Sequence, residues 1–213
     1  MPKLLEYELG NEVHAFSTMR AAGQSQDAYA HFNINPYCGD NPEHVAQNVN
    51  ALCHMLDIAP NNLVLPHQTH ETTVRLVASE LLTMPQMVRQ MVLEGVDALI
   101  TNVPGVCIGV STADCIPIIL YDAEHRATAA IHAGWRGTVK RIAQNTIAQM
   151  HTAFGTNPQS LRAIIGPGIS LHNFEVGNEV YEAFANAAFP MQEIAQRQEK
   201  WHINLPLCNQ MQL

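Results

Sequence analysis

The 213-residue sequence has few charges, and positive charge is the scarcer sign. Only 14% of the residues are charged, and 11 Lys and Arg against 19 Asp and Glu give a net charge of −8. A surface that binds nucleic acid or an anionic membrane needs a basic patch to neutralise phosphates. The sequence therefore predicts neither partner, and any Arg beside a candidate site gains weight as a functional residue.

Long apolar runs and paired cysteine motifs are also missing. No stretch approaches the roughly 18 apolar residues of a membrane-spanning helix, and the N-terminal segment lacks the apolar core of a signal peptide. The five cysteines are odd in number and show no C-x-x-C spacing, which argues against a disulfide framework and a zinc ribbon. We therefore expect a soluble protein of the reducing cytoplasm.

The chain does contain enough apolar sequence for one packed domain, which we expect to span residues 1–213. Hydrophobic residues make up 47% of it, and no repeat or linker divides it. The apolar pattern predicts strands at residues 13–17, 63–66, 72–77, 97–101, 106–111, 116–121, 127–132 and 161–166. Helices are predicted at residues 42–56 after a cap at Asp40 or Asn41, at 138–154, at 177–189, and, broken by Pro85, at 80–93.

The strands cluster in the middle of the chain with helices around them, which favours an α+β fold over a strict βαβ repeat. The near-continuous apolar strands between residues 97 and 132 indicate burial on both faces. Residues 20–41 are rich in Gly, Asn, Asp and Pro and predict a long structured loop. A loop of that length in a compact domain is more often functional than idle.

Two short motifs carry most of the chemistry: Thr112-Ala113-Asp114-Cys115 and His132-Ala133-Gly134-Trp135-Arg136-Gly137. Each places a thiol or an imidazole at the end of a predicted strand, so the two side chains can face each other. His70, in Gln68-Thr69-His70, adds a second imidazole. One thiolate and two imidazoles suit zinc with an open fourth position, which is the arrangement of a catalytic metal site.

Each of these residues also has an ordinary structural interpretation. Cys115 alone would more often be an inert core thiol, and His132 alone a hydrogen-bonded structural histidine. Asp114 shifts the balance, because an acidic residue flanked by apolar strand sequence must be paired or functional. Gly134 and Gly137 predict a tight turn into a helix near Thr138, where Arg136 and backbone N–H groups can hold an anion. Eight other histidines have no ligand-like pattern: His14, His31, His44, His54, His125, His151, His172 and His202.

Taken together, the ordered motifs resemble the laccase-domain family, long labelled multicopper polyphenol oxidase and now viewed as zinc-dependent purine nucleoside phosphorylases. The resemblance covers nearly the whole chain. It rests on the motifs already given and on Val96-Asp97-Ala98-Leu99-Ile100-Thr101, Ile165-Gly166-Pro167-Gly168-Ile169, Phe174-Glu175-Val176-Gly177, Phe16-Ser17-Thr18-Met19-Arg20 and Phe32-Asn33-Ile34-Asn35.

The resemblance implies mixed β-sheets packed as a sandwich and flanked by helices. It also implies a metal, Zn²⁺ or Cu²⁺, held by His70, Cys115 and His132. Asp114, Cys115 and His132 are the implied catalytic residues, with Asp114 as a general base or a residue that orients a ligand. Substrate and phosphate contacts are expected from Arg20, Asn33, Gln68 and Arg136.

The expected reaction is phosphorolysis of adenosine, inosine, guanosine or methylthioadenosine to a base and a pentose 1-phosphate. Adenosine deamination would be an additional activity, as in zinc deaminases that attack a purine C6 carbon. The expected partners are thus a purine nucleoside and phosphate, with a homo-oligomer left open. A metal-free hydrolase with Cys115 as nucleophile and His132 as base stays an alternative, as do a copper-dependent oxidase and a non-enzymatic purine-binding module.

The chain departs from the family pattern at three places. Gly168 stands where the family commonly has a cysteine, and Asn204 stands where it has an acidic residue before the last helix. Family members also continue beyond this point with a cysteine-containing segment and an aromatic, Arg-rich tail. We therefore expect a C-terminal tail to be missing from this sequence.

Overall fold

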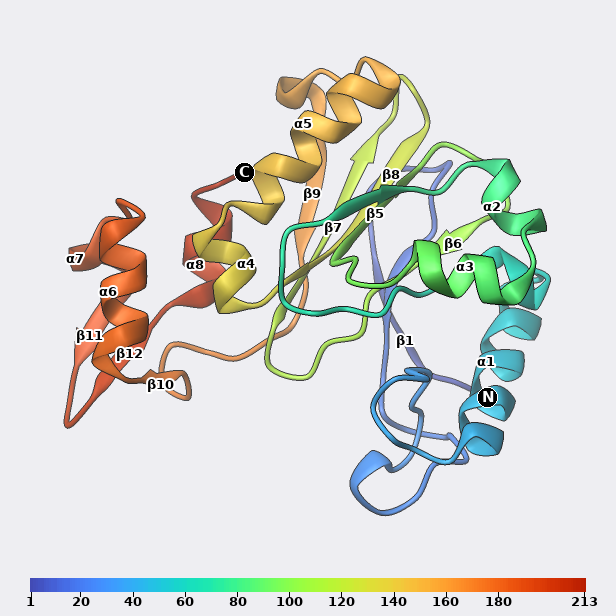
Figure 1. The fold of residues 1–213 in the computed structure, drawn as a ribbon, viewed down its shortest axis with the longest axis horizontal. Coiled ribbons are helices and arrows are strands. Elements are labelled where there is room, and N and C mark those ends of the chain that lie inside the picture. The colour runs from blue at the N-terminus through green and yellow to red at the C-terminus, as the bar shows by residue number, and fades with distance from the viewer.

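The computed structural model describes all residues from Met1 to Leu213. A five-stranded sheet in the order β4-β5-β8-β7-β9 forms its centre (Figure 1). Its strands are β4 (Val74–Leu76), β5 (Ala98–Thr101), β7 (Ile116–Asp122), β8 (Ala127–Ala133) and β9 (Arg162–Ile165). Only β4 and β5 run parallel, and the other neighbours are antiparallel. The α+β prediction with mixed strand directions is confirmed.

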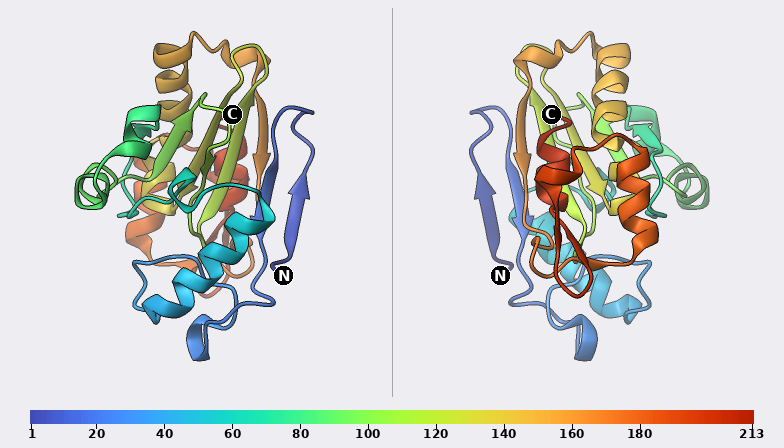
Figure 2. Two further views of the ribbon diagram at one scale, coloured as in Figure 1. Left: turned by 90° about the vertical axis from the view of Figure 1, so that its right-hand side faces the viewer. Right: turned by 90° about the vertical axis from the view of Figure 1, so that its left-hand side faces the viewer.

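Five helices cover one face of this sheet, and two small sheets with three further helices cover the other (Figure 2). On the first face, a core of 20 buried residues joins the strands to the surrounding helices. These helices are α4 (Trp135–Val139), α5 (Ile142–Phe154), α6 (Asn178–Asn186), α7 (Met191–Ile194) and α8 (Leu205–Gln210). A three-stranded sheet in the order β10-β12-β11 lies beside α6; its strands are β10 (Glu175–Val176), β11 (Ala195–Arg197) and β12 (Trp201–Ile203).

The opposite face carries two separate two-stranded sheets. The antiparallel pair β1 (Leu4–Tyr7) and β2 (Ala15–Thr18) packs through Leu9 and Ala15 against Tyr121 of β7. The parallel pair β3 (Leu63–Val64) and β6 (Cys107–Ile108) packs with α2 (Ser79–Thr83) and α3 (Gln86–Val92) against Leu99 of β5. Helix α1 (Pro42–Met55) packs on the second pair through its own small core.

Several local predictions are confirmed for physical reasons. Asn41 caps α1 by accepting a hydrogen bond from the N–H of Glu43, and Pro42 occupies the first turn, where a missing N–H costs nothing. Pro85 separates α2 from α3. The loop at residues 20–41 contains only the single 3₁₀ turn Asp27–Tyr29. No helix of the structure is both long and apolar enough to cross a membrane.

The helix predicted at residues 138–154 is wrong at its start. The structure has a short helix from Trp135 and a second one from Ile142, separated at Arg141, whose φ of 63° is left-handed. The Arg141 guanidinium holds this break, since it donates to the carbonyl of Ala187 at 2.7 Å and stacks on Phe189. Helix α6 also ends at Asn186, earlier than predicted. Strands β1 and β10 to β12 are additional to the predicted ones.

Candidate metal centre

Three side chains from distant segments of the chain meet at one end of β8. His132 is the last residue but one of β8, Cys115 directly precedes β7, and His70 lies in the loop before β4. Their ligand atoms all lie within 4.8 Å of one another. The imidazole rings of His70 and His132 meet edge to face, with centroids 4.9 Å apart. The register of β7 and β8 causes this meeting, because it pairs Ile116, the residue after Cys115, with Ala133.

Gly134 keeps the space between the three cluster residues free of a side chain. A Cβ at this position would lie 3.0 Å from Cys115 Sγ, 3.1 Å from His70 Cδ2 and 3.9 Å from His132 Cε1. The donor set of one thiolate and two imidazoles matches a zinc ion with one open coordination position. The residues present therefore fit a metal ion in both chemistry and space.

The carboxylate of Asp97 supports two of the three cluster residues. Its Oδ1 accepts a hydrogen bond from His132 Nδ1 at 2.8 Å and one from the backbone N–H of His70 at 3.0 Å. Its Oδ2 accepts from the N–H groups of Glu71 at 2.8 Å and Thr69 at 3.3 Å. Burial raises the pKa of Asp97, but the bonds from His132, Glu71 and Thr69 outweigh it and hold this pKa below its usual value.

Sequence reasoning did not select Asp97 as a site residue, although a signal was present. Asp97 is an acidic residue at the start of an apolar strand, and its exposed fraction is 0%. The rule that such a residue must be paired or functional was applied to Asp114 and fits Asp97 better. Asp114 is exposed, and its carboxylate makes no hydrogen bond within the protein.

The two imidazoles have opposite pKa shifts. Burial lowers the pKa of His70, and the nearby His132 and Arg136 lower it further, so its ring is neutral at neutral pH. Burial also lowers the pKa of His132, but hydrogen bonds to Asp97 and Cys115 outweigh this effect and raise it to about 9. A metal ion that binds His132 must therefore displace a proton, which makes metal affinity depend on pH.

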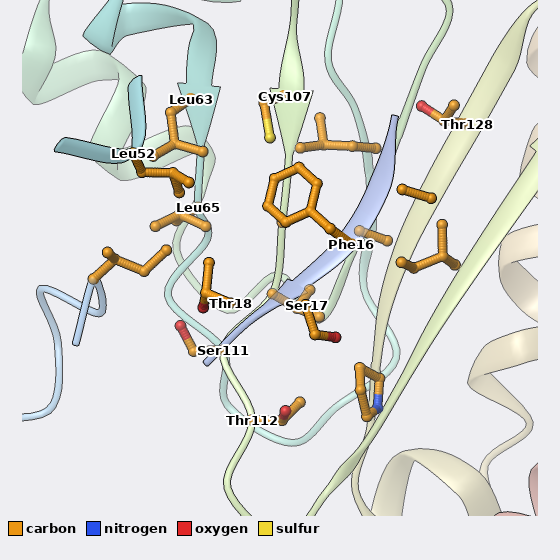
Figure 3. A pocket seen from close by; sticks show the side chains of 18 of the residues that line it. Phe16, Ser17, Thr18, Leu52, Leu63, Leu65, Cys107, Ser111, Thr112 and Thr128 are labelled. Atoms are coloured by element: carbon orange, nitrogen blue, oxygen red, sulfur yellow. The ribbon is translucent and has the colours of Figure 1, made fainter. Parts of the chain in front are cut away.

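A large cavity ends beside this cluster. It has a volume of about 1160 Å³ and lies between β2, the β3–β6 pair and the face of β7 and β8. Figure 3 shows Phe16 projecting from β2 toward Cys107 of β6, with Ser111 and Thr112 at the lower end of the cavity. Asp114 also lines that end, whereas the three metal-binding candidates do not. His70 is exposed, so the cluster itself is open to solvent.

The two arginines that were predicted to bind phosphate lie in different settings. Arg136 is exposed, and its guanidinium lies 4.4 Å from the ring centre of Trp135. Arg20 is also exposed, but its guanidinium donates twice to the carbonyl of Ala30, at 3.0 and 2.7 Å. The Arg136 guanidinium is hydrogen-bonded to no protein oxygen, whereas the Arg20 guanidinium stabilises the loop that follows β2.

The predicted amide residues both use their side chains within the protein. Gln68 donates to the carbonyl of Ser111 at 2.8 Å and accepts from its N–H at 2.7 Å. This pair of bonds ties the loop of His70 to the loop that leads to Cys115. Asn33 donates to the carboxylate of Asp40 at 2.9 Å and lines the cavity.

Two of the three departures from the family pattern, Gly168 and Asn204, have local structural reasons. A Cβ at Gly168 would lie 2.5 Å from Ile116 Cδ1 and 3.0 Å from the carbonyl oxygen of Cys115. Glycine at this position therefore lets the segment after β9 approach the backbone beside the cluster. Asn204 caps α8 by accepting a hydrogen bond from the N–H of Leu207 at 3.1 Å.

Comparison with known proteins identifies close relatives of this chain. A purine nucleoside phosphorylase from Bacteroides thetaiotaomicron is 47% identical over 95% of this chain and 76% of its own length. Adenosine deaminase RL5, from an unknown prokaryotic organism, is 39% identical over 92% of this chain and 76% of its own length. The crystal structure of the hypothetical protein YfiH from Bacillus licheniformis matches with a TM-score of 0.91 at 26% identity, and the match covers 100% of this chain and 80% of that one.

The family model described as multi-copper polyphenol oxidoreductase laccase matches residues 14–213. This match covers all three residues of the cluster as well as Asp97. The chain belongs to the multi-copper polyphenol oxidoreductase laccase family.

Proposed function

We propose that this protein is a purine nucleoside phosphorylase that also deaminates adenosine, and that it works at a zinc site. The substrates would be adenosine, inosine, guanosine or methylthioadenosine, together with phosphate. The observation that carries the proposal is the meeting of His70, Cys115 and His132 within 4.8 Å. It occurs in a chain 47% identical to a purine nucleoside phosphorylase and 39% identical to an adenosine deaminase.

The donor set favours Zn²⁺ as the metal, with Cu²⁺ as its competitor because imidazole and thiolate bind both ions. Zn²⁺ on three protein ligands supplies a Lewis acid that polarises an oxygen atom at the remaining position. The family is described as multi-copper, which implies several copper sites, whereas this structure has one cluster of three possible metal ligands. A copper-dependent polyphenol oxidase is therefore the weaker assignment.

The remaining residues would bind the substrates and move protons. Asp114 lies next to Cys115 and lines the adjoining cavity, so its exposed carboxylate is our candidate for the general base. Arg136 presents an exposed guanidinium near His70 and is our first candidate for holding phosphate. We assign Arg20, Asn33 and Gln68 to the same substrate region.

The proposed site accounts for the composition of the chain as well. A nucleoside and phosphate are small molecules, so no basic surface is needed beyond Arg136 near the cluster and Arg20 in the cavity. All five cysteines are free thiols, which suits a reducing compartment, and we place the protein in the cytoplasm.

One observation favours a second candidate, a metal-free cysteine hydrolase. Asp97, His132 and Cys115 lie in the order of a carboxylate, an imidazole and a thiol, as in a nucleophilic triad. In that function Cys115 would attack the substrate, His132 would take its proton and Asp97 would orient the ring. His70 would then have no chemical role, which is why the metal site is preferred.

The test is turnover of adenosine and inosine by the purified protein, with and without phosphate, alongside measurement of its bound metal. Phosphate-dependent release of the base, and inosine formation from adenosine, are expected only from protein that holds one zinc ion per chain. His70→Ala should abolish both the zinc and the turnover. His67→Ala is the matched control, because His67 lies three residues earlier and stacks on Tyr37 instead.

Each alternative gives a different result in the same experiment. Full activity in protein stripped of metal, with loss in Cys115→Ala but not in His70→Ala, would establish the hydrolase. Zinc binding without any release of base or ammonia would overturn the enzymatic proposal and favour a purine-binding module.

A further inference from the structure

Asp97 contacts two of the three cluster residues although it is not itself placed to be a ligand. One oxygen of its carboxylate accepts both the ring N–H of His132 and the backbone N–H of His70. The side chains of His132 and Asp97 are 4% and 0% exposed, so water cannot replace either partner. The bond uses Nδ1 of His132 and leaves Nε2 of the ring for the cluster.

The backbone of His70 has a conformation that needs outside support. Its φ of 64° is left-handed, which side chains with a Cβ adopt rarely and at a cost in free energy. This conformation turns the N–H groups of Thr69, His70 and Glu71 toward one carboxylate. Such a concave group of backbone donors binds an anion, and here the anion is Asp97.

We propose that Asp97 is the positioning residue of the metal site and couples two of its ligands. One carboxylate fixes the backbone that carries His70 and the tautomer and orientation of the His132 ring. The affinity for metal should therefore fall when the Asp97 charge is removed, even though all three ligands remain. This inference rests on the metal site of the proposed function, but its test measures metal binding and not turnover.

The chain contains a matched control at the other end of β8. Asp122 accepts hydrogen bonds from the N–H groups of Glu124 and His125, at 3.0 and 3.2 Å, and from His125 Nδ1, at 2.8 Å. Its side chain is 1% exposed. This carboxylate has the same kinds of partner as Asp97, but no thiol and no second imidazole complete a metal site there.

The experiment compares Asp97→Asn with Asp122→Asn. Zinc affinity is measured by competition with a chromophoric chelator, and folding is checked by circular dichroism and thermal unfolding. Loss of a hydrogen bond that supports a metal ligand typically weakens affinity by about tenfold to a hundredfold, and we expect this from Asp97→Asn. Asp122→Asn should bind zinc as the wild type does, although it is also less stable.

Two outcomes would overturn the proposal. The first is a folded Asp97→Asn protein whose zinc affinity lies within about twofold of the wild type, well short of the loss expected for a supporting residue. The second is an equal loss of affinity in both variants, because this would show that general destabilisation causes the effect.

A measurement on the wild-type protein keeps the inference testable if Asp97→Asn does not fold. Nitrogen-15 NMR of the zinc-loaded protein should show His132 with a proton on Nδ1 and the metal on Nε2. The reverse assignment would refute the proposal, since Asp97 could not then orient the ring. Failure of the enzymatic function would leave both metal-binding results unchanged, so the two proposals fail separately.

Discussion

Two aspartate–histidine pairs, each with a buried carboxylate, lie at opposite ends of β8, and only one of them belongs to a candidate site. Asp97 binds His132 and Asp122 binds His125, both through Nδ1 at 2.8 Å. Both carboxylates also accept backbone N–H bonds, and both have a pKa below the usual value. An Asp–His pair with these features is therefore not sufficient to mark a functional site.

The pairs differ in what surrounds the imidazole and in how far apart their partners lie in the sequence. Asp122 and His125 are three residues apart, and they close the turn between β7 and β8. Asp97 and His132 are 35 residues apart, and Cys115 and His70 lie beside the His132 ring. The local pair stabilises a turn, whereas the distant pair brings separate segments together around one point.

Replacing the two histidines in turn should give the largest contrast between the pairs. His132→Gln removes a proposed ligand, and its effect on zinc affinity should exceed the roughly tenfold to hundredfold loss typical of a supporting residue. His125→Gln should leave zinc binding unchanged. Metal content after dialysis, measured by mass spectrometry, checks both variants. Full zinc content in folded His132→Gln would remove this residue from the proposed site.

A smaller effect on zinc affinity should come from filling the space between the three cluster residues. Gly134→Ala places a methyl group 3.0 Å from Cys115 Sγ and 3.1 Å from His70 Cδ2. The φ of Gly134 is −69°, so the backbone tolerates alanine and the effect should come from contact alone. We expect weaker zinc binding, about tenfold as for other changes that shift a ligand, with little change in thermal stability.

Gly109→Ala is the matched control for this substitution. A Cβ at Gly109 would also lie 3.0 Å from a side-chain atom, Leu65 Cδ2, but no atom of the three cluster residues lies within 4 Å of it. Competition with a chelator measures both variants. Equal zinc affinity in Gly134→Ala and the wild type would mean that the glycine is not needed for space at the metal.

The contrast between the pairs also explains how much of the site could be predicted from the sequence. His70, Cys115 and His132 were selected because a thiol and two imidazoles in short motifs have a shared chemistry. The role of Asp97 could not be obtained this way, because it depends on β5 pairing with β8 and on the left-handed backbone of His70. Asp114 was selected instead because it is adjacent in sequence to Cys115, although its side chain is exposed.

The same distinction between local and distant interactions holds for the fold. Strands β5, β7 and β8 of the central sheet were predicted because their apolar runs are nearly continuous, and α1 because its cap and proline are local signals. The break at Arg141 was missed because its cause is distant, namely the bonding of the guanidinium to Ala187 and Phe189. Apolar spacing continues across the break and so favours one long helix.

The smallest expected effect is the pH dependence of the Asp122 pair, which can be measured without metal. Burial raises the pKa of Asp122, but the hydrogen bonds that it accepts, including that from His125, outweigh this and lower it. A lowered pKa in the folded state stabilises the protein above the unfolded value of 3.8. That stabilisation is lost as the pH falls through the folded pKa.

Asp122→Asn should therefore be less stable than the wild type near neutral pH, by about 1.5–3 kcal/mol for hydrogen bonds to a charged group. The difference should shrink below pH 3.8, where the wild-type carboxyl becomes protonated. Urea unfolding with a chelator present measures this difference. The contribution of Asp97 to the pH dependence cancels in the comparison because both proteins retain Asp97. If the difference in unfolding free energy stays constant through this range, the charge of Asp122 contributes no stability. The side chain would then stabilise the turn through its shape and hydrogen bonds alone.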